Sequence, residues 1–392
     1  MADALPTSAD VVVVGAGCIG ASTAVHLVLA GVRNVVLIEK GAPASMTTGW
    51  SSAIVRQHYS QPTFARWAAE SLVVWRRFSD VFGVAPVFTA TGWAIAGSAA
   101  DAEPMRQCVV LLRGLGVETE LLAREDLAAL DPSVHVEDFA CAAYEPDAGY
   151  CDPRAAAAGF AEAFERHGGR ARFGVRVTGL RRDGDAWALQ TAAGTIRSPR
   201  IVNAAGAYAR WLAALAGVEV PIEHYAHDIS VFGSVGGRIA LYDLVRSAYY
   251  RPNGSAETLV GSMNWSEGAR VLDDPDAFPW VANPQVAARH GRALAWRYPG
   301  AEPGLVRGHA GIYFITPDRY PILGEAPEAP GLFLACGFSH GFKVSPAVGE
   351  AIATRLTQGT QAAPELDEFR PTRFADGQPI KPLYPYPSGI QT

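Results

Sequence analysis

The sequence has few charges and no basic run. Charged residues make up 18% of its 392 residues, and the formal net charge is −6. Basic residues are adjacent only in pairs such as Arg76-Arg77 and Arg181-Arg182, which we expect on solvated faces. A chain without a basic patch does not attract nucleic acid or an anionic membrane surface, so neither is expected as a partner.

Cysteine is also scarce. The five cysteines are odd in number and include no CxxC pair. This usage argues against a disulfide framework and against a zinc site. It is typical of a reducing compartment, and we expect a cytoplasmic protein.

No group of residues has the spacing of a metal site or of a Ser-His-Asp triad, and no metal is expected. His224 and His227 are three apart on an expected strand and therefore face opposite sides, which suits a metal poorly. We expect one of them in the core and the other exposed. A role for either histidine in a substrate pocket is the alternative.

Residues 11–32 contain no charged side chain, a length that could span a bilayer. Three glycines within six residues, and a valine run that changes to helical periodicity, argue against a membrane helix. A signal peptide is disfavoured because the first ten residues contain Asp3 and Asp10 but no Lys or Arg. With 49% hydrophobic residues, the chain can bury a large core, and we expect a soluble protein of two domains.

The beginning of the chain has the pattern of a dinucleotide-binding βαβ unit. Four valines, 11–14, precede a glycine turn, an uncharged helical stretch to Gly31, and a second apolar run that ends in Glu39. A strand, a glycine turn, a helix and a strand with a terminal acid are together much more specific than the glycines alone. An adenine dinucleotide is the expected ligand.

Each part of this unit has an expected role. Gly15 permits the tight turn, Gly17 lets the backbone approach a pyrophosphate, and Gly20 lets the helix lie close to the strand. The helix N-terminus, at Cys18 and Ile19, offers unpaired N–H groups to the pyrophosphate. Glu39 is placed to accept hydrogen bonds from a ribose hydroxyl.

Further elements alternate along the chain. Helices are expected at 63–82, at 99–115 and at 153–167, the last capped by Asp152, and the final helix is expected to begin with Ser345 as N-cap and Pro346 in its first turn. Strands at 175–180, 187–191 and 195–197 lead into Asn203–Ala207, a strand end of small residues that permits close approach of a ligand. Residues 218–306 are strand-like and aromatic-rich, which predicts an antiparallel sheet.

Three separated segments carry a resemblance to a known family. They are the βαβ unit with Glu39, the strand end Asn203–Ala207, and Thr316-Pro317-Asp318 followed by the loop 337–343. In this order they resemble the FAD-dependent amine and amino-acid oxidoreductases of the D-amino-acid oxidase superfamily. The resemblance is to the branch that holds sarcosine oxidase, dimethylglycine dehydrogenase and glycine oxidase.

The resemblance implies a mixed α/β fold. A glutathione-reductase-like Rossmann FAD domain would be interleaved with an antiparallel-sheet substrate domain. The FAD domain would comprise residues 1–85, 145–215 and 308–370, and the substrate or cap domain residues 86–144 and 216–307. Residues 371–392, rich in proline, would form an extended tail.

The resemblance also implies cofactor contacts beyond the first βαβ unit, and the final helix would direct its positive end toward the flavin ring. The residues implied are Lys40, Ser51, Ser52, Val175, Ala205, Gly206, Gly337, Ser339, Gly341, Phe342 and Lys343.

Four residues match catalytic positions of the family. Arg56 and Lys343 would bind the substrate carboxylate, for which guanidinium offers a planar fork and ammonium a point charge. Tyr313 would lie near the substrate amine, and His340 in a flavin-side loop. The alternatives are a surface salt bridge for Arg56, a solvated loop for Lys343, and satisfied core positions for Tyr313 and His340.

The chain departs from the family pattern at several positions. The cysteine or histidine that attaches FAD covalently in some relatives is replaced by Gly311 or Ser51, so we predict non-covalent FAD. A lysine that promotes reaction with oxygen falls near Leu259, and a substrate-site histidine near Met263. The loop 337–343 is one residue shorter than usual, which could shift Lys343.

The sequence therefore predicts an enzyme that oxidises the C–N bond of an amino acid or N-alkyl amino acid. Hydride transfer to flavin would give an imine that water hydrolyses, with oxygen or another acceptor taking the electrons. An FAD-carrying subunit of a hetero-oligomer is one alternative, and the oligomeric state, homo- or hetero-oligomer, stays open. A nicotinamide-dependent dehydrogenase, which would share the first βαβ unit but not need the loop 337–343, is another.

Overall fold

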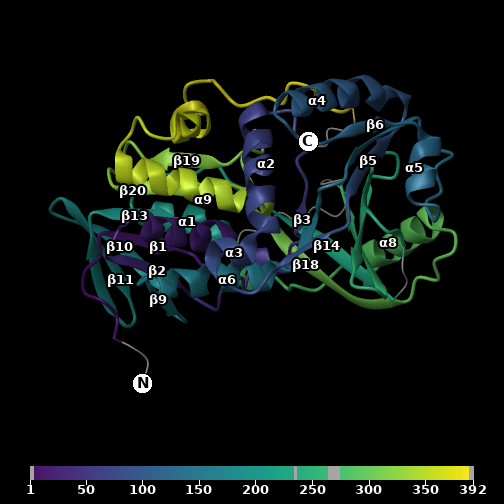
Figure 1. Ribbon diagram of the computed structural model, residues 1–392. Helices are drawn as coiled ribbons and strands as arrows, with labels where there is room; N and C mark the ends of the chain where they lie inside the picture. The colour runs from purple at the N-terminus through teal and green to yellow at the C-terminus, as the bar shows by residue number, and fades with distance from the viewer. Residues whose placement is uncertain (1–3, 234–235, 264–273, 388–392) are drawn as a thin grey trace.

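Two sheets with covering helices make up the computed structural model, which describes residues 4–233, 236–263 and 274–387 (Figure 1). A mostly parallel sheet with helices α1, α6 and α9 lies at one end, and a mostly antiparallel sheet with α4, α5 and α8 at the other. The predicted mixed α/β fold class is confirmed. No helix in the described ranges is long and apolar enough to cross a membrane.

The parallel sheet is built around the valine strand of the first βαβ unit. Its strands, in spatial order, are β19 Ile322–Glu325, β20 Leu332–Cys336, β13 Arg200–Asn203, β1 Val11–Val14, β2 Val35–Glu39 and β9 Arg170–Phe173. Only β19 runs antiparallel to its neighbour. Alternate valines of β1 pack into two different hydrophobic clusters, because both faces of the sheet are covered.

Different elements cover the two faces of this sheet. One face packs against three helices, α1 Cys18–Leu29, α6 Pro153–Arg166 and α9 Gly341–Gln358. The other packs against a meander of three strands, β10 Val177–Asp183, β11 Ala186–Thr191 and β12 Gly194–Ser198. Asp152 caps α6 as predicted, because its carboxylate accepts from the N–H groups of Arg154 and Ala155.

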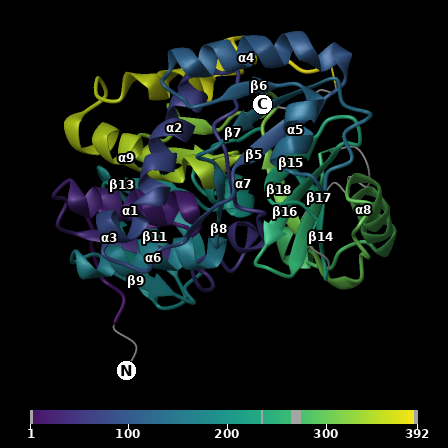
Figure 2. The same cartoon turned by 45° about the vertical axis from the view of Figure 1, so that its right-hand side comes forward.

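The second sheet has eight strands, and only the β15–β5 pair is parallel. In spatial order they are β18 Leu305–Ile315, β14 Glu223–Phe232, β17 Glu257–Ser262, β16 Ala248–Asn253, β15 Ala240–Asp243, β5 Trp93–Gly97, β7 Cys141–Glu145 and β6 Glu120–Leu122. Helix α4, Ala102–Gly114, packs on one face, and α5, Arg124–Leu130, with α8, Pro284–Arg297, on the other (Figure 2). The antiparallel sheet predicted for 218–306 is present in the described part of that segment.

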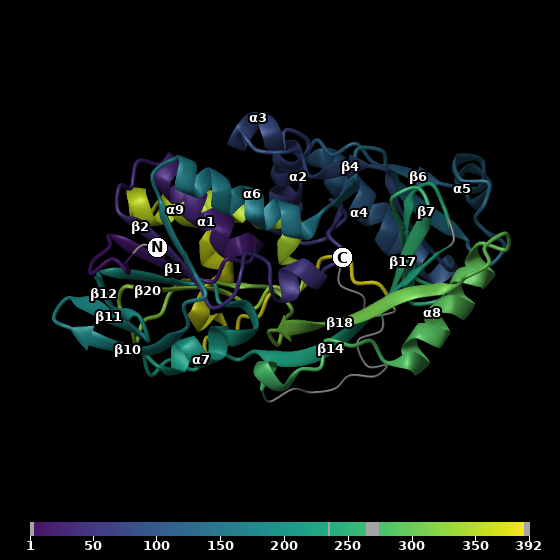
Figure 3. The same cartoon turned by 90° about the horizontal axis from the view of Figure 1, so that it is seen from below.

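The longest ladder of the molecule's described sheets joins β14 to β18. It is antiparallel and runs from the pair Glu223 and Ile315 to the pair Phe232 and Leu305. Seen from below, the two strands lie side by side and extend from the region of helix α7, Ala209–Ala214, toward α8 (Figure 3). Short strands β3 Ile54–Val55, β8 Gly149–Cys151 and β4 Phe88–Ala90 form a small sheet of their own.

The helix predicted at 63–82 is wrong in one respect, since it is broken. Helix α2 spans Pro62–Arg76 and α3 spans Phe78–Phe82, with Arg77 between them at φ −114°. The break lets Phe78 stack on Trp75, with ring centroids 5.5 Å apart and planes 20° apart. Both rings are buried in the same hydrophobic cluster, which also contains Phe160.

The predicted start of the last helix is also wrong. Helix α9 begins at Gly341, four residues before Ser345, so that Pro346 lies inside the helix. Proline has no N–H for the carbonyl of Phe342, but the Ser345 hydroxyl donates to that carbonyl at 2.8 Å. The Ser-Pro pair is typical of a helix start, but here it lies inside α9, where the serine hydroxyl replaces the hydrogen-bond donor that proline lacks.

The chain beyond α9 has two short 3-10 helices, Pro364–Phe369 and Pro371–Arg373, and residues 374–387 after them have no regular helix or strand. It crosses above α2 toward α4, seen in yellow in Figure 1. The domain boundaries expected from the sequence stay predictions.

Candidate active site

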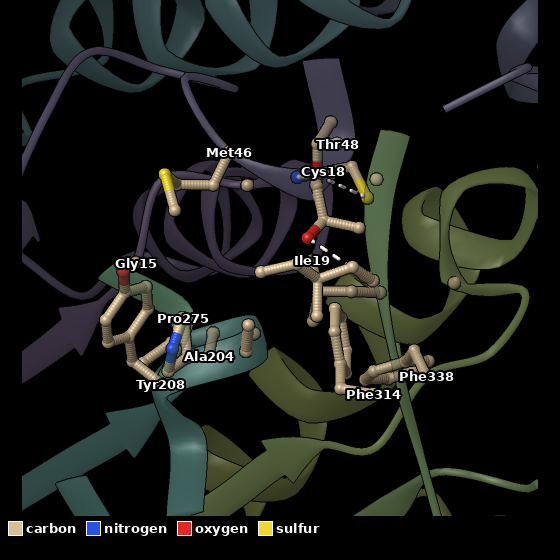
Figure 4. Close-up of a pocket in the computed structure, with 18 of the residues that line it drawn as sticks. Gly15, Cys18, Ile19, Met46, Thr48, Ala204, Tyr208, Pro275, Phe314 and Phe338 are labelled. Atoms are coloured by element: carbon tan, nitrogen blue, oxygen red, sulfur yellow. Dashed lines mark hydrogen bonds between the residues drawn. The ribbon is translucent and has the colours of Figure 1, made fainter. Parts of the chain in front are cut away.

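A cavity of about 700 Å³ lies between the two sheets. Its walls come from the ends of β1 and β2, from the residues after β13, from β14 and β18, and from the loop that precedes α9. Figure 4 shows the end of the cavity at the glycine turn, with Cys18 and Thr48 at the top, Gly15 with Tyr208 at the left, and Phe314 with Phe338 at the lower right.

The glycine turn is packed too closely for side chains. A Cβ at Gly20 would lie 1.9 Å from the Gly15 carbonyl oxygen, and one at Gly15 would lie 2.3 Å from the Ala204 carbonyl oxygen. Gly15 also has φ +107°, in the region that favours glycine. The predicted close approach of helix and strand is therefore observed, and the N-terminus of α1 is left open toward the cavity.

This geometry suits a pyrophosphate. Gly17 and Cys18 line the cavity. The Cys18 N–H donates to the Thr48 hydroxyl at 3.2 Å and not to a backbone carbonyl of the helix. A Cβ at Gly17 would come within 3.0 Å of the same hydroxyl oxygen. Backbone N–H groups at the positive end of a helix are a ready site for phosphate oxygens.

Glu39 lies where a ribose is expected. Its two carboxylate oxygens accept from the N–H of Ala16 at 2.9 Å and from the N–H of Gly41 at 2.8 Å. These bonds hold the carboxylate at the cavity wall beside the glycine turn. The neighbouring Lys40 pairs with Asp276 at 2.8 Å and lies over the Tyr208 ring at 3.7 Å.

Most residues predicted to contact the cofactor line the cavity. They are Gly15, Gly17, Cys18, Ile19, Glu39, Lys40, Ser51, Ser52, Val175, Ala205, Gly206, Ser339, Gly341, Phe342 and Lys343. Gly20 and Gly337 are not part of the lining. Gly337 has φ +75°, and a Cβ there would lie 2.5 Å from the Thr316 side chain, so this glycine shapes the loop.

Arg56 lies behind the cavity wall and is completely buried. Its guanidinium carbon is 4.2 Å from the ring centroid of Tyr59, 5.1 Å from that of Tyr242 and 5.2 Å from that of Trp93. Nη1 donates to the His58 carbonyl, whereas Nε and Nη2 have no partner. Because Arg56 is fully buried, the alternative of a surface salt bridge is excluded. Its Nε and Nη2 are buried donors without an acceptor, which is unusual in a folded protein.

Lys343 is the second cation at this end. It lies in the first turn of α9, is 6% exposed and lines the cavity, so it does not belong to a solvated loop. Its carbonyl accepts from Trp75 Nε1 at 3.0 Å, which fixes the turn, and its Nζ lies 5.8 Å from the Tyr59 centroid. Burial, and then the charge of Arg56, hold the pKa of Lys343 well below its usual range.

Sequence reasoning missed the anion of this cluster, Glu145. It ends β7 and is fully buried; one carboxylate oxygen accepts from the Gln57 N–H at 2.7 Å, and the other has no partner. Burial raises its pKa to about 7 against the opposing effects of the Gln57 bond and of the charges on Arg56 and Lys343. A glutamate that ends a strand gives no sign of burial in the sequence.

Tyr313 and His340, the other two residues predicted to be catalytic, both line the cavity. Burial is the main cause of a raised Tyr313 pKa and of a strongly lowered His340 pKa, which the charges of Lys343 and Arg56 lower further. The histidine is therefore neutral at physiological pH. Both side chains therefore lie where a bound molecule could contact them.

His227 is the residue whose predicted placement is wrong. His224 is in the core and donates from Nε2 to the Ala207 carbonyl at 2.8 Å, but His227 faces the cavity rather than solvent. Its Nε2 is 3.1 Å from the Tyr249 hydroxyl oxygen, and its ring centroid is 4.6 Å from that of Tyr313. The two histidines do face opposite sides of β14 as predicted, but the second side faces the cavity and not solvent.

The positions noted as departures are also defined. Gly311 and Ser51 line the cavity, and a Cβ at Gly311 would lie 3.7 Å from the Cβ of Trp50. Leu259 and Met263 are buried apolar residues outside the lining. The short loop does not separate Lys343 from Arg56, since both lie beside Tyr59.

Comparison with known proteins agrees with this architecture. The chain is 29% identical over 386 residues to the mitochondrial sarcosine dehydrogenase of Homo sapiens, covering 93% of this chain and 41% of that protein. It is 27% identical over 381 residues to the sarcosine oxidase subunit beta of Rhodobacter capsulatus, covering 94% of this chain and 89% of that subunit. The chain thus spans about two fifths of the sarcosine dehydrogenase.

Solved structures share the fold. L-proline dehydrogenase from P. horikoshii superposes with a TM-score of 0.86 at 24% identity over 96% of this chain and 100% of that chain. Glycine oxidase from Geobacillus kaustophilus superposes with a TM-score of 0.80 at 24% identity, covering 94% of this chain and 99% of that chain. A family model described as FAD dependent oxidoreductase (DAO) matches residues 10–355, which include the glycine turn, Arg56 and the loop 337–343. The chain belongs to this family of FAD-dependent oxidoreductases.

Proposed function

We propose that the protein oxidises the C–N bond of an amino acid or N-alkyl amino acid to an imine, which water then hydrolyses. One observation carries the proposal: Arg56 is buried with two unpartnered nitrogens beside the buried Lys343. Glu145 forms no ion pair with either of them in the described structure, because one of its oxygens accepts from Gln57 and the other has no partner. The guanidinium fork and the ammonium are therefore available to a substrate carboxylate. The relatives named for sarcosine and proline support an amino acid with a secondary amine as substrate.

The residues of the chain would bind and orient this substrate. The carboxylate would reach Nε and Nη2 of Arg56 past Tyr242 and Tyr313, which line the cavity. Its negative charge would favour the protonated form of Lys343, whose pKa is lowered by burial. Fixing the carboxylate holds the carbon that bears the amine in one place. The neutral His227 and His340 leave the amine free of a competing positive charge.

FAD, when bound, supplies the acceptor for the two electrons and the hydrogen of the substrate C–H bond. The first turn of α9, from Gly341 to Lys343, lines the cavity and points the positive end of an 18-residue helix into it. Such a helix end stabilises negative charge that develops nearby. Oxygen or another acceptor would take the electrons after the imine is released.

A panel of substrates tests the proposal. Anaerobic mixing with N-methylglycine, L-proline and primary amino acids should bleach the flavin absorbance with at least one of them. Pyrrolidine, which is proline without its carboxylate, is the matched control and should fail at the same concentration. Equal bleaching by proline and pyrrolidine would contradict a carboxylate receptor at Arg56, and subsequent exposure to air distinguishes an oxidase from a dehydrogenase.

We also propose that FAD is bound without a covalent link, since glycine and serine occupy the positions of the attaching residues, Gly311 and Ser51. Acid precipitation of the purified protein should leave all of the yellow colour in the supernatant. The absorbance of the supernatant and of the redissolved pellet measures the partition. A pellet that stays yellow after repeated washing would show a covalent bond.

An FAD-carrying subunit of a larger enzyme is a second candidate. The sarcosine oxidase subunit beta of Rhodobacter capsulatus matches this chain over 89% of its own length, so the two chains are similar in extent. A subunit of this kind would need a partner to pass its electrons onward. Bleaching by substrate in the chain purified alone would argue against such a requirement.

The buried Glu145 predicts a pH dependence of stability. Its pKa of about 7 in the folded protein is above its ordinary value of 4.5, so the folded state binds the proton more tightly than the unfolded state does. This contribution is fully present below pH 4.5 and is lost as the pH rises through about 7. Between pH 5 and pH 8 the free energy of unfolding should therefore fall more in the wild type than in Glu145→Gln, which keeps an acceptor for Gln57.

Urea unfolding at several pH values measures this difference. Asp185→Asn, at an exposed acid with 97% side-chain exposure, is the control and should follow the wild type at every pH. Parallel curves for Glu145→Gln and the wild type would show that Glu145 does not titrate in this range.

A further inference from the structure

The C-terminal segment returns to the active-site end of the cavity. It lies beyond residue 355, where the family match ends. Asp318 anchors it: the carboxylate binds the Arg373 guanidinium, with Nε to Oδ2 at 2.8 Å, and accepts from the Ile380 N–H at 2.9 Å. Both members of this ion pair are buried, so the segment has a fixed starting point.

One side chain of the segment is inserted into the protein. Tyr386 is 2% exposed, although its neighbours Pro385 and Pro387 are exposed and Leu383 is 54% exposed. The Tyr386 ring belongs to the same hydrophobic cluster as Trp93 and Tyr242, two of the rings that surround Arg56. Tyr386 is the one fully buried residue between Arg373 and Pro387, whereas Ile380 and Tyr384 are partly buried against the core.

Tyr386 is connected to Arg56 through His58. The Tyr386 hydroxyl oxygen is 2.9 Å from His58 Nε2, across 328 positions in the sequence. The carbonyl of the same histidine accepts from Arg56 Nη1. Burial, and then the charge of Arg56, lower the His58 pKa to about 3, so this is a bond between neutral groups at physiological pH.

The loop that carries Arg56 needs such an anchor. Residues 56–60 have no regular secondary structure, so side-chain bonds decide where the His58 carbonyl lies. Gln57 is held by Glu145 from one side, and the His58 ring by Tyr386 from the other. A guanidinium has to be held in one orientation to offer its fork to a carboxylate.

We propose that Tyr386 is a positioning residue of the carboxylate site, which fixes His58 and thereby the direction in which Arg56 presents Nε and Nη2. The proposal rests on the proposed function, since it assigns Tyr386 to the same receptor. It makes the C-terminal segment part of the active site. The residues of the segment that the structure describes, up to Pro387, do not line the cavity, so Tyr386 would act through His58 and Arg56.

Tyr386→Phe tests this role, because it removes the hydroxyl and keeps the buried ring. Anaerobic flavin reduction of the holoenzyme by N-methylglycine and by L-proline gives an apparent Kd and a limiting rate. The apparent Kd should rise threefold to tenfold, and the limiting rate should change less than twofold. The control is Tyr384→Phe, on the same segment, which should match the wild type.

A double substitution separates positioning from general loosening. In an Arg56→Lys background the Nη1 bond to His58 is gone, so Tyr386→Phe should cause no further rise in the apparent Kd. An equal rise in both backgrounds would mean that Tyr386 only stabilises the fold, and would overturn the proposal. An unchanged Kd for Tyr386→Phe in the wild-type background would overturn it too.

Failure of the proposed function has a different signature. If the proposed function is wrong, neither N-methylglycine nor L-proline bleaches the flavin of the wild-type protein, and acetate does not change the flavin spectrum. The role of Tyr386 at a carboxylate site would then fail with it. A wild-type response together with an unchanged Tyr386→Phe overturns the role of Tyr386 alone.

Discussion

Arg56→Ala should weaken the binding of a carboxylate substrate on the order of 100-fold, because it removes one partner of a fully buried charge pair. Lys343→Ala should weaken it in the same direction. FAD should remain bound in both variants, since the glycine turn and Glu39 are distant parts of the cavity wall. Titration of the flavin spectrum with proline or acetate measures the affinity, and the ratio of flavin to protein absorbance measures FAD content.

Arg56→Lys is the informative comparison for this prediction. Lysine keeps the charge but loses the planar fork, so its affinity should lie between those of the wild type and Arg56→Ala. If Arg56→Ala binds the carboxylate as the wild type does, Arg56 has no part in the receptor. If FAD is lost together with substrate affinity, the role of Arg56 is structural.

Gly20→Ala should lower FAD content sharply. The new Cβ would lie 1.9 Å from the Gly15 carbonyl oxygen and 3.0 Å from the Cβ of Ala204, and neither the backbone nor an alanine Cβ can rotate away. Helix α1 has to shift away from the turn, which displaces the N–H groups expected to bind the pyrophosphate. Overpacking of this kind costs about 1–3 kcal/mol, and if this cost falls on the FAD-bound state, FAD affinity drops by roughly 5-fold to 150-fold.

Gly114→Ala is the matched control for this substitution. Gly114 ends helix α4, has nothing within 4 Å of a Cβ, and should keep full FAD content. Equilibrium dialysis of the apoprotein with FAD gives the affinity, and circular dichroism shows whether the fold is retained. Wild-type FAD affinity in Gly20→Ala would refute the close-packing argument.

The first βαβ unit could be predicted from the sequence because its signals are local. The valines of β1 are buried on both faces, and Gly15 and Gly20 serve the turn and the packing that their spacing predicts. The helix boundaries near Arg77 and Ser345 could not be predicted in this way. They depend on the stacking of Trp75 with Phe78 and on the Ser345 hydroxyl, which are results of tertiary packing.

The candidate site likewise contains residues that could be predicted from the sequence and residues that could not. Tyr313, His340 and Lys343 were identified through a resemblance, and the structure brings them together with Arg56 at one end of the cavity. The partners of Arg56 were missed because they come from remote parts of the chain. Glu145 is 88 residues from Gln57, and Tyr386 is 328 residues from His58.

The ladder between β14 and β18 has a consequence for substrate choice. His227 and Tyr313 lie on these two strands, two residues out of register, with His227 opposite Gly311 and Tyr225 opposite Tyr313. Sliding one strand past the other would break the hydrogen bonds of the whole ladder at once. The two rings are in contact, with centroids 4.6 Å apart, so they form one rigid piece of the cavity wall. A bulkier substrate would have to be accommodated by other parts of that wall.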